Sequence, residues 1–135
     1  MTASIPFDNT IPQQSEGTEL MTVTVTPQHA GSKLLIQFDG WFTEDSVAAM
    51  TLAVFRDAGA DAILCRGFTA HVGSGHAFGM MLRGYVDAGT AGVAQTLKVR
   101  VGVTAGNLGF LCSPDTTAYF DGTDQAVFTV TEIKQ

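Results

Sequence analysis

The residues of this chain best suited to chemistry are its histidines, and two of them, His71 and His76, bracket the glycine-rich stretch "VGSG". A metal site on β-strands usually starts from two histidines one residue apart and needs further ligands that converge on the same point. The spacing of five does not provide that start, so the sequence favours ordinary loop histidines. We therefore predict no metal ligands and no cofactor.

Two other stretches resemble reactive motifs without meeting their requirements. Ser74 has a glycine directly on each side, whereas a nucleophile elbow needs glycines two residues away, between a strand and a helix. The acidic loop from Asp121 to Asp124 has fewer carboxylates than a calcium-binding loop, and its Asp-Gly pair is typical of a turn. The sequence therefore predicts a protein that is not an enzyme.

The whole-chain composition sets the class of protein. The chain has 135 residues, which predicts one domain spanning 1–135, and only 15% of the residues are charged. The net charge of −6, with seven scattered basic residues, argues against a nucleic-acid partner. No secretory signal is visible, and the most apolar stretch, Ala48 to Phe55, is too short to cross a membrane.

The two cysteines, Cys65 and Cys112, are too few for a disulfide framework. Two buried thiols in a protein made in a reducing cytoplasm are favoured over one disulfide. The sequence does not show whether the two are neighbours in space.

Short alternating segments bounded by turns predict β-strands throughout. A period of two, with apolar residues on one side, is typical of a half-buried strand. It is clearest in the stretches "TELMTVTVTP", "KLLIQF", "AFGMMLRGYVD", "TLKVRVGV" and "AVFTVTEI". With the shorter segments "LGFLC" and "TAYF", the pattern gives nine or ten strands. The expected fold is all-β, an antiparallel two-sheet β-sandwich.

The stretch from Glu44 to Arg56 fits a helical stripe and an alternating strand equally well. The following "DAGADA" has the composition of a hairpin turn. We predict two strands joined by this turn, because a short helix would have to be followed at once by a hairpin-type return.

Several predicted strands are apolar on both faces. Leu35 interrupts the polar side of its strand, and Met81 and Tyr85 do the same on theirs. An isolated sandwich usually has one apolar and one polar face on each strand. We expect these three residues to contribute to self-association into a homo-oligomer, although scattered exposed apolar residues are also common on monomers.

The opening stretch "IPFDNTIPQQSEGTEL" cannot be helical, because Pro6 and Pro12 remove backbone donors and favour extended geometry before them. Residues 1–17 are therefore a possible extended N-terminal arm that lies across a neighbouring molecule. The alternative, compatible with the first, is an edge strand of the same sandwich.

Five stretches in order resemble a family of small bacteriophage and prophage virion domains. The family has an opening of the form I-P-x-D-D-T-I-P-Q-x-x-E-G-x-E, and this chain has Asn9 at one of the two Asp positions. The other stretches are "TPQHAGSKLLIQF", "LAVFRDAGADAI", "TLKVRVG" and "FTVTEI". The resemblance implies a jelly-roll sandwich similar to tumour-necrosis-factor-like trimers. It further implies a head decoration (cementing) protein or a tail-fibre tip.

Because Met1 precedes the opening motif by only a few residues, we expect a free-standing domain, which favours head decoration. The partner would be the major capsid protein, and the protein would lie on the capsid surface of the virion after synthesis in the host cytoplasm. Contact residues in the arm would be Ile5, Phe7 and Ile11. A trimer is favoured by the resemblance, and a dimer comes next.

The alternative is a tail-fibre tip that recognises a host glycan or protein through loops at one end of the sandwich. Trp41 could stack on a sugar there, although a single Trp in a β-sandwich usually belongs to the core. An enzyme, such as a cupin-like oxygenase, is disfavoured because the sequence nominates no ligand set.

Overall fold

The computed structural model describes residues 1–70, 76–112 and 117–135, and these residues form eight β-strands and one 3-10 turn. The strands are β1 Thr18–Val25, β2 Lys33–Glu44, β3 Ala48–Arg56, β4 Leu64–Ala70, β5 His76–Asp87, β6 Gln95–Val103, β7 Leu108–Phe110 and β8 Val127–Ile133. The turn, η1, spans Phe120–Gly122. Among the described residues there is no helix of the length and apolarity needed to cross a membrane.

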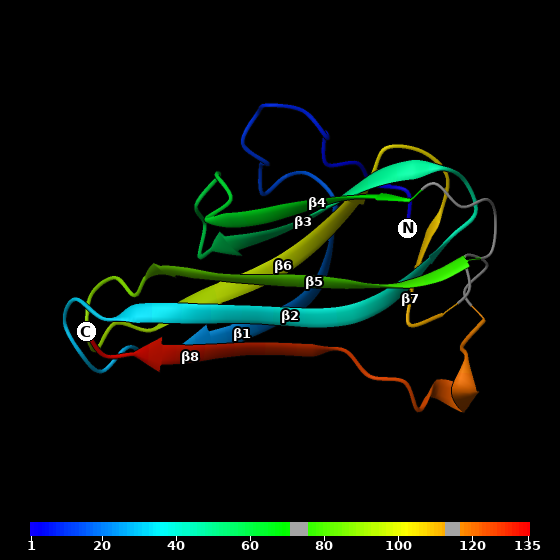
Figure 1. The fold of residues 1–135 in the computed structure, drawn as a ribbon. Helices are drawn as coiled ribbons and strands as arrows, with labels where there is room; N and C mark the ends of the chain where they lie inside the picture. Colours follow the sequence, from blue (N-terminus) through cyan, green and yellow to red (C-terminus); the bar gives the residue numbers. More distant parts are fainter. Residues whose placement is uncertain (71–75, 113–116) are drawn as a thin grey trace.

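The strands form two antiparallel sheets that pack face to face as a β-sandwich, as the ribbon in Figure 1 shows. The first sheet has the order β1-β6-β3-β4. In the second sheet, β5 pairs with one edge of the long strand β2, while β8 and β7 share the other edge. The predicted all-β, two-sheet antiparallel sandwich is confirmed. Its jelly-roll connectivity stays a prediction.

The core lies between the sheets and follows the alternation in the sequence. Phe38 and Phe42 of β2 are almost completely buried, and the rings of Phe42 and Phe110 have centroids 5.1 Å apart. Eight predicted inward positions of β2, β5 and β6 are also buried, which confirms the alternation of these strands: Leu34, Ile36, Met80, Leu82, Leu97, Val99, Val101 and Val103. The inward positions of β1, Met21, Val23 and Val25, are half-buried.

Two predicted segments have different outcomes. The stretch after Glu44 does form strands β3 and β4 around the "DAGADA" turn, so that prediction is confirmed. The predicted strand "TAYF" is wrong, because the chain turns there into η1. Phe120 and Asp121 have φ values of 50° and 54°, a left-handed conformation that no β-strand adopts.

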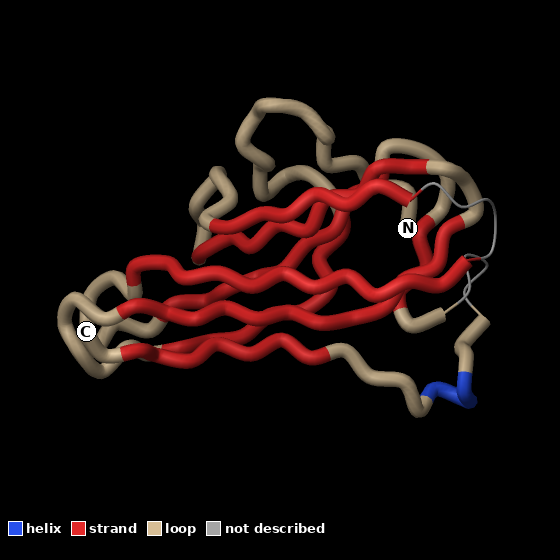
Figure 2. Tube along the Cα trace, in the orientation of Figure 1, coloured by secondary structure: helices blue, strands red, loops and turns tan. Residues whose placement is uncertain are grey.

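Strand β3 is buried on both faces, although it is not covered by a third sheet. Its outward residues Ala53 and Phe55 are 0% exposed. Figure 2 shows loop segments, drawn in tan, outside the first sheet. The N-terminal segment, residues 1–17, is one of them and is blue in Figure 1. This segment therefore supplies the cover for the outer face of the first sheet.

Candidate interaction surfaces

The predicted partner contacts of the N-terminal segment divide into one buried side chain and two exposed ones. Ile5 is 0% exposed and packs with Ala53 and Phe55 on the outer face of the first sheet. Phe7 and Ile11 are 49% and 58% exposed. The prediction that Ile5 contacts another protein is wrong, because its side chain belongs to the core of its own chain. Phe7 and Ile11 stay candidate contacts.

Backbone contacts hold residues 1–5 tightly against β6 and β7. The Met1 ammonium donates to the Leu108 carbonyl at 2.7 Å, and the Leu108 amide donates to the Met1 carbonyl at 2.9 Å. A Cβ atom on Gly102 would collide with the backbone nitrogen of Ile5. Glycine at this position of β6 therefore allows the segment to lie directly on the sheet.

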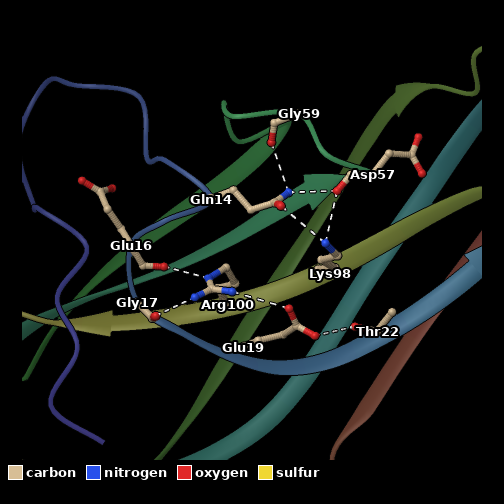
Figure 3. A network of polar contacts seen from close by, with 9 residues as sticks. All are labelled: Gln14, Glu16, Gly17, Glu19, Thr22, Asp57, Gly59, Lys98 and Arg100. Carbon is tan, nitrogen blue, oxygen red and sulfur yellow. Dashed lines mark hydrogen bonds and ion pairs between the residues drawn. The ribbon is translucent and has the colours of Figure 1, made fainter.

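A polar network fixes the other end of the N-terminal segment (Figure 3). Arg100, on the outer face of β6, donates to the carbonyls of Glu16 at 2.7 Å and Gly17 at 2.8 Å. Its guanidinium also lies 3.5 Å from the Glu19 carboxylate. Lys98, the next outward residue, donates to the side-chain oxygen of Gln14 at 3.4 Å and to a carbonyl in the β3–β4 turn at 3.2 Å. The outward direction of both basic residues was predicted, and the structure shows that they anchor the segment.

Residues 6–12, between these two anchored ends, form a loop on the surface. The Phe7 ring lies over Gly67 of β4, at a place where a Cβ atom would collide with the ring. The hydroxyl and the amide of Thr10 donate to the Asp8 carboxylate at 2.6 and 2.8 Å, and they lower the pKa of Asp8. The loop is thus shaped by local contacts and keeps Phe7 half-exposed.

The outer face of the second sheet carries large apolar side chains in contact with solvent. Met81, Tyr85 and Val127 are 59%, 62% and 53% exposed. We call this surface the open face. Its residues, placed by strand register, are Tyr85, Leu35 and Thr131 in one row, Arg83, Gln37 and Thr129 in the next, and Met81, Asp39 and Val127 in the third.

The residues predicted for self-association all lie on the open face, but they differ in accessibility. Met81 and Tyr85 are exposed, whereas Leu35 is 9% exposed between its cross-strand neighbours Tyr85 and Thr131. Leu35 therefore offers little surface to a partner unless Tyr85 moves. Val127 was left out of the predicted site, although the alternation of its strand placed it on this side.

A shallow hollow lies across the middle of the open face. Its lining consists of Gln37, Phe38, Asp39, Arg66, Met81, Leu82, Arg83, Val127 and Thr129. Arg66 reaches it from β4, and the other residues come from β5, β2 and β8. The hollow therefore combines apolar walls with charges of both signs.

An aromatic cluster forms one end of the second sheet. The Trp41 ring lies 5.3 Å from the Tyr119 ring and 6.5 Å from the Phe120 ring, measured between centroids. Phe120 is 71% exposed, and these rings line an open groove with Ala77 and Gly79. The expectation that Trp41 belongs to the core is wrong. The cluster was missed because "TAYF" was interpreted as a strand.

The structure describes only some of the candidate reactive residues. His71 and Ser74 lie outside the described residues. His76 is exposed at the start of β5, and no group of three His, Cys, Asp or Glu residues in the described ranges could hold a metal ion. Both cysteines are free, Cys65 exposed and Cys112 half-buried, so the expected burial is wrong for Cys65.

Glu44 is the one fully buried carboxylate among the described residues, at 1% exposure. Neither of its oxygens has a hydrogen-bond partner within the part of the chain that the structure describes. Burial, with a smaller contribution from the neighbouring charge of Asp45, raises the pKa of Glu44, and His76 acts in the opposite direction. A carboxyl at the end of β2 with a raised pKa is stabilised in its neutral form.

Comparison with known proteins gives no relative: no protein-family model matches the chain, and no curated protein matches its sequence.

Proposed function

We propose that this protein is a bacteriophage head decoration protein, which binds the outer capsid surface and stabilises contacts between neighbouring major capsid proteins. The sequence motifs shared with small phage virion domains motivate the proposal. The observation that carries it is that exposed apolar side chains occur on two separate surfaces of one sandwich. Phe7 and Ile11 lie beside the first sheet, while Met81 and Tyr85 lie on the second.

A protein that joins two neighbours needs two contact surfaces. Large exposed apolar groups that recur on opposite sides of a small domain are suited to this task, because each can be removed from water by a different partner. A site for small-molecule chemistry would instead gather its polar groups in one concave pocket. The described residues present broad surfaces, which supports a structural role.

The loop of residues 6–12 is suited to bind a capsid surface. Its two ends are held by the buried Ile5 and by the hydrogen bond from the Ala62 amide to the Pro12 carbonyl at 2.9 Å. A loop fixed at both ends loses little conformational entropy when it docks. Phe7 and Ile11 are its accessible apolar side chains, so they are the proposed capsid contacts.

Co-sedimentation with phage heads that lack the protein tests this proposal. The protein should bind expanded heads and leave precursor shells largely bare, because expansion creates the final surface between capsomers. Bound protein should also raise the heat resistance of the heads by mass action. Changing Phe7 and Ile11 together to Ser should weaken binding by about tenfold or more.

Val93→Ser is the matched control, since Val93 is 55% exposed and lies in the β5–β6 loop. Truncation of the N-terminal segment is unsuitable here, because it would remove Ile5 from the core. A protein that ignores heads but binds host cells would refute head decoration.

A second candidate is a tail-fibre tip that recognises a host glycan, favoured by the cluster of Trp41, Tyr119 and Phe120. The apolar faces of sugar rings pack on exposed aromatic rings, and the indole and phenol groups can add hydrogen bonds. Binding of the protein to host cells that is abolished by Trp41→Ala, with head binding absent, would select this function.

A further inference from the structure

The open face presents large apolar side chains in two rows, with the polar row of Arg83, Gln37 and Thr129 between them. We infer that it pairs with the open face of a second copy of this chain, in a two-fold symmetric contact between the two second sheets. The inference deepens the head-binding proposal, because it assigns a second copy as the partner of Met81 and Tyr85 on the open face. The loop of residues 6–12 lies beside the other sheet and stays accessible to the capsid in the pair.

The charges of the open face favour a second copy as the occupant. The chain as a whole has a net charge of −6, so most surfaces of two copies repel each other. The open face instead combines Asp39 with Arg83, and Arg66 lies at its central hollow. At its end, Lys33 and Asp87 neutralise each other in an ion pair. This face can therefore meet itself without a net repulsion.

The strand register identifies the symmetry axis that satisfies these charges. The axis lies in the interface, perpendicular to the strands, between the row of Gln37 and the row of Asp39. Gln37 of one copy then faces Asp39 of the second copy, and its amide can donate to that carboxylate. Arg83 is one strand away, at a spacing of about 4.8 Å, and its long side chain can reach the same carboxylate.

The same axis matches large side chains to empty space. Tyr85 of one copy faces Gly79 of the second copy, where an added Cβ atom would meet nothing within 4 Å. Leu35 faces Trp41, and Thr129 faces Val127. The Tyr85 ring, which is 62% exposed in the single chain, would thus occupy the gap beside Trp41 of the other copy.

The size of the face predicts a weak dimer. From the row of Leu35 to the row of Trp41 the strands run for roughly 20 Å, and three strands span roughly 14 Å. An area of this size is well below that of standard protein interfaces and lies in the range of weak association. We expect dissociation in about the micromolar range or above.

Sedimentation velocity over a concentration series tests the pairing. The wild-type protein should change from monomer to dimer as its concentration rises. Gly79→Arg should keep it monomeric, because the new side chain fills the space for Tyr85, while the open surroundings leave folding unaffected. Val93→Arg, which adds the same charge to an exposed loop, should leave the dimer unchanged.

An exchange of charges tests the proposed register. Asp39→Arg and Arg83→Asp should each weaken the dimer by about tenfold, and the double variant should recover at least part of this loss. Recovery requires contact between the two positions, so a merely structural role of either residue would not produce it. A wild-type monomer at all concentrations, a trimer, a dimer unaffected by Gly79→Arg, or a double variant without recovery would each overturn the inference.

Discussion

The two outer faces of this sandwich differ in what covers them. On the first sheet, Ala53 and Phe55 point outward and are completely buried under Ile5. On the second sheet, Met81 and Tyr85 also point outward and are more than half exposed. Both β3 and β5 have apolar residues on their inner and outer faces. The outer apolar residues are buried on β3 and exposed to solvent on β5.

This difference shows that a strand with two apolar faces does not by itself indicate a partner protein. For β3 the second apolar face is covered by a segment of the same chain, which lies close to the sheet because Gly102 has no side chain. For β5 the side chains of the second face are left in contact with solvent. An oligomer should therefore form through the open face, while the covered face should matter mainly for stability.

The largest expected effect separates the two faces by stability. Ile5→Ala should lower the free energy of unfolding by about 2–5 kcal/mol, because it leaves a cavity under a fully buried side chain. Met81→Ala should change it by less than about 0.5 kcal/mol, because Met81 is exposed. Urea denaturation measures both changes in free energy, at a protein concentration too low for dimers to form. Equal effects of the two substitutions would mean that the faces do not differ in this way.

The sandwich itself could be predicted from the sequence because alternation is a local property. Leu97, Val99 and Val101 of β6 recur every second residue, and this period alone determines which side is buried. The cover of the first sheet could not be predicted, because it depends on contact between Ile5 and Gly102. These residues are distant in the sequence, and no periodic pattern connects them.

The candidate surfaces were predictable to different extents for the same reason. Met81 and Tyr85 were correctly placed on the outer side by the alternation of β5. The aromatic cluster of Trp41 and Tyr119 depends on a turn that begins at Phe120. The left-handed conformation of Phe120 is rare for a large side chain, so the local sequence gave no reason to expect it.

A smaller effect is expected from the polar anchor of the N-terminal segment. Arg100→Met should lower the free energy of unfolding by about 1–2 kcal/mol, because the carbonyls of Glu16 and Gly17 lose their donors in a partly buried place. It should also increase protease cleavage within residues 1–17. Arg83→Met makes the same change on the open face, where no such loss is expected. If both variants were equally stable, the network in Figure 3 would not hold the segment.

The last effect concerns the edge of the second sheet, and it is present at neutral pH and lost in acid. The Glu132 carboxylate of β8 accepts hydrogen bonds from the Ser32 hydroxyl at 2.5 Å and from the amides of Gln28 and His29 at 2.8 and 2.9 Å. These bonds, that of Ser32 first, lower the pKa of Glu132 to about 2 from an ordinary value of 4.5. They connect β8 to the turn between β1 and β2.

The folded state stabilises the ionised form of Glu132. The contribution of this residue to stability is therefore complete above the ordinary pKa of 4.5 and is lost as the pH falls through about 2. Glu132→Gln should therefore be less stable than wild type at neutral pH, and the difference should shrink between these two values. Thermal unfolding of both proteins across this pH range measures it.

The segment around Ile5 has no part in these bonds, so the additional cost of Ile5→Ala should be the same at pH 3 and pH 7. A cost that changes with pH in step with Glu132 would show that the covered face and the edge of the second sheet respond as one unit.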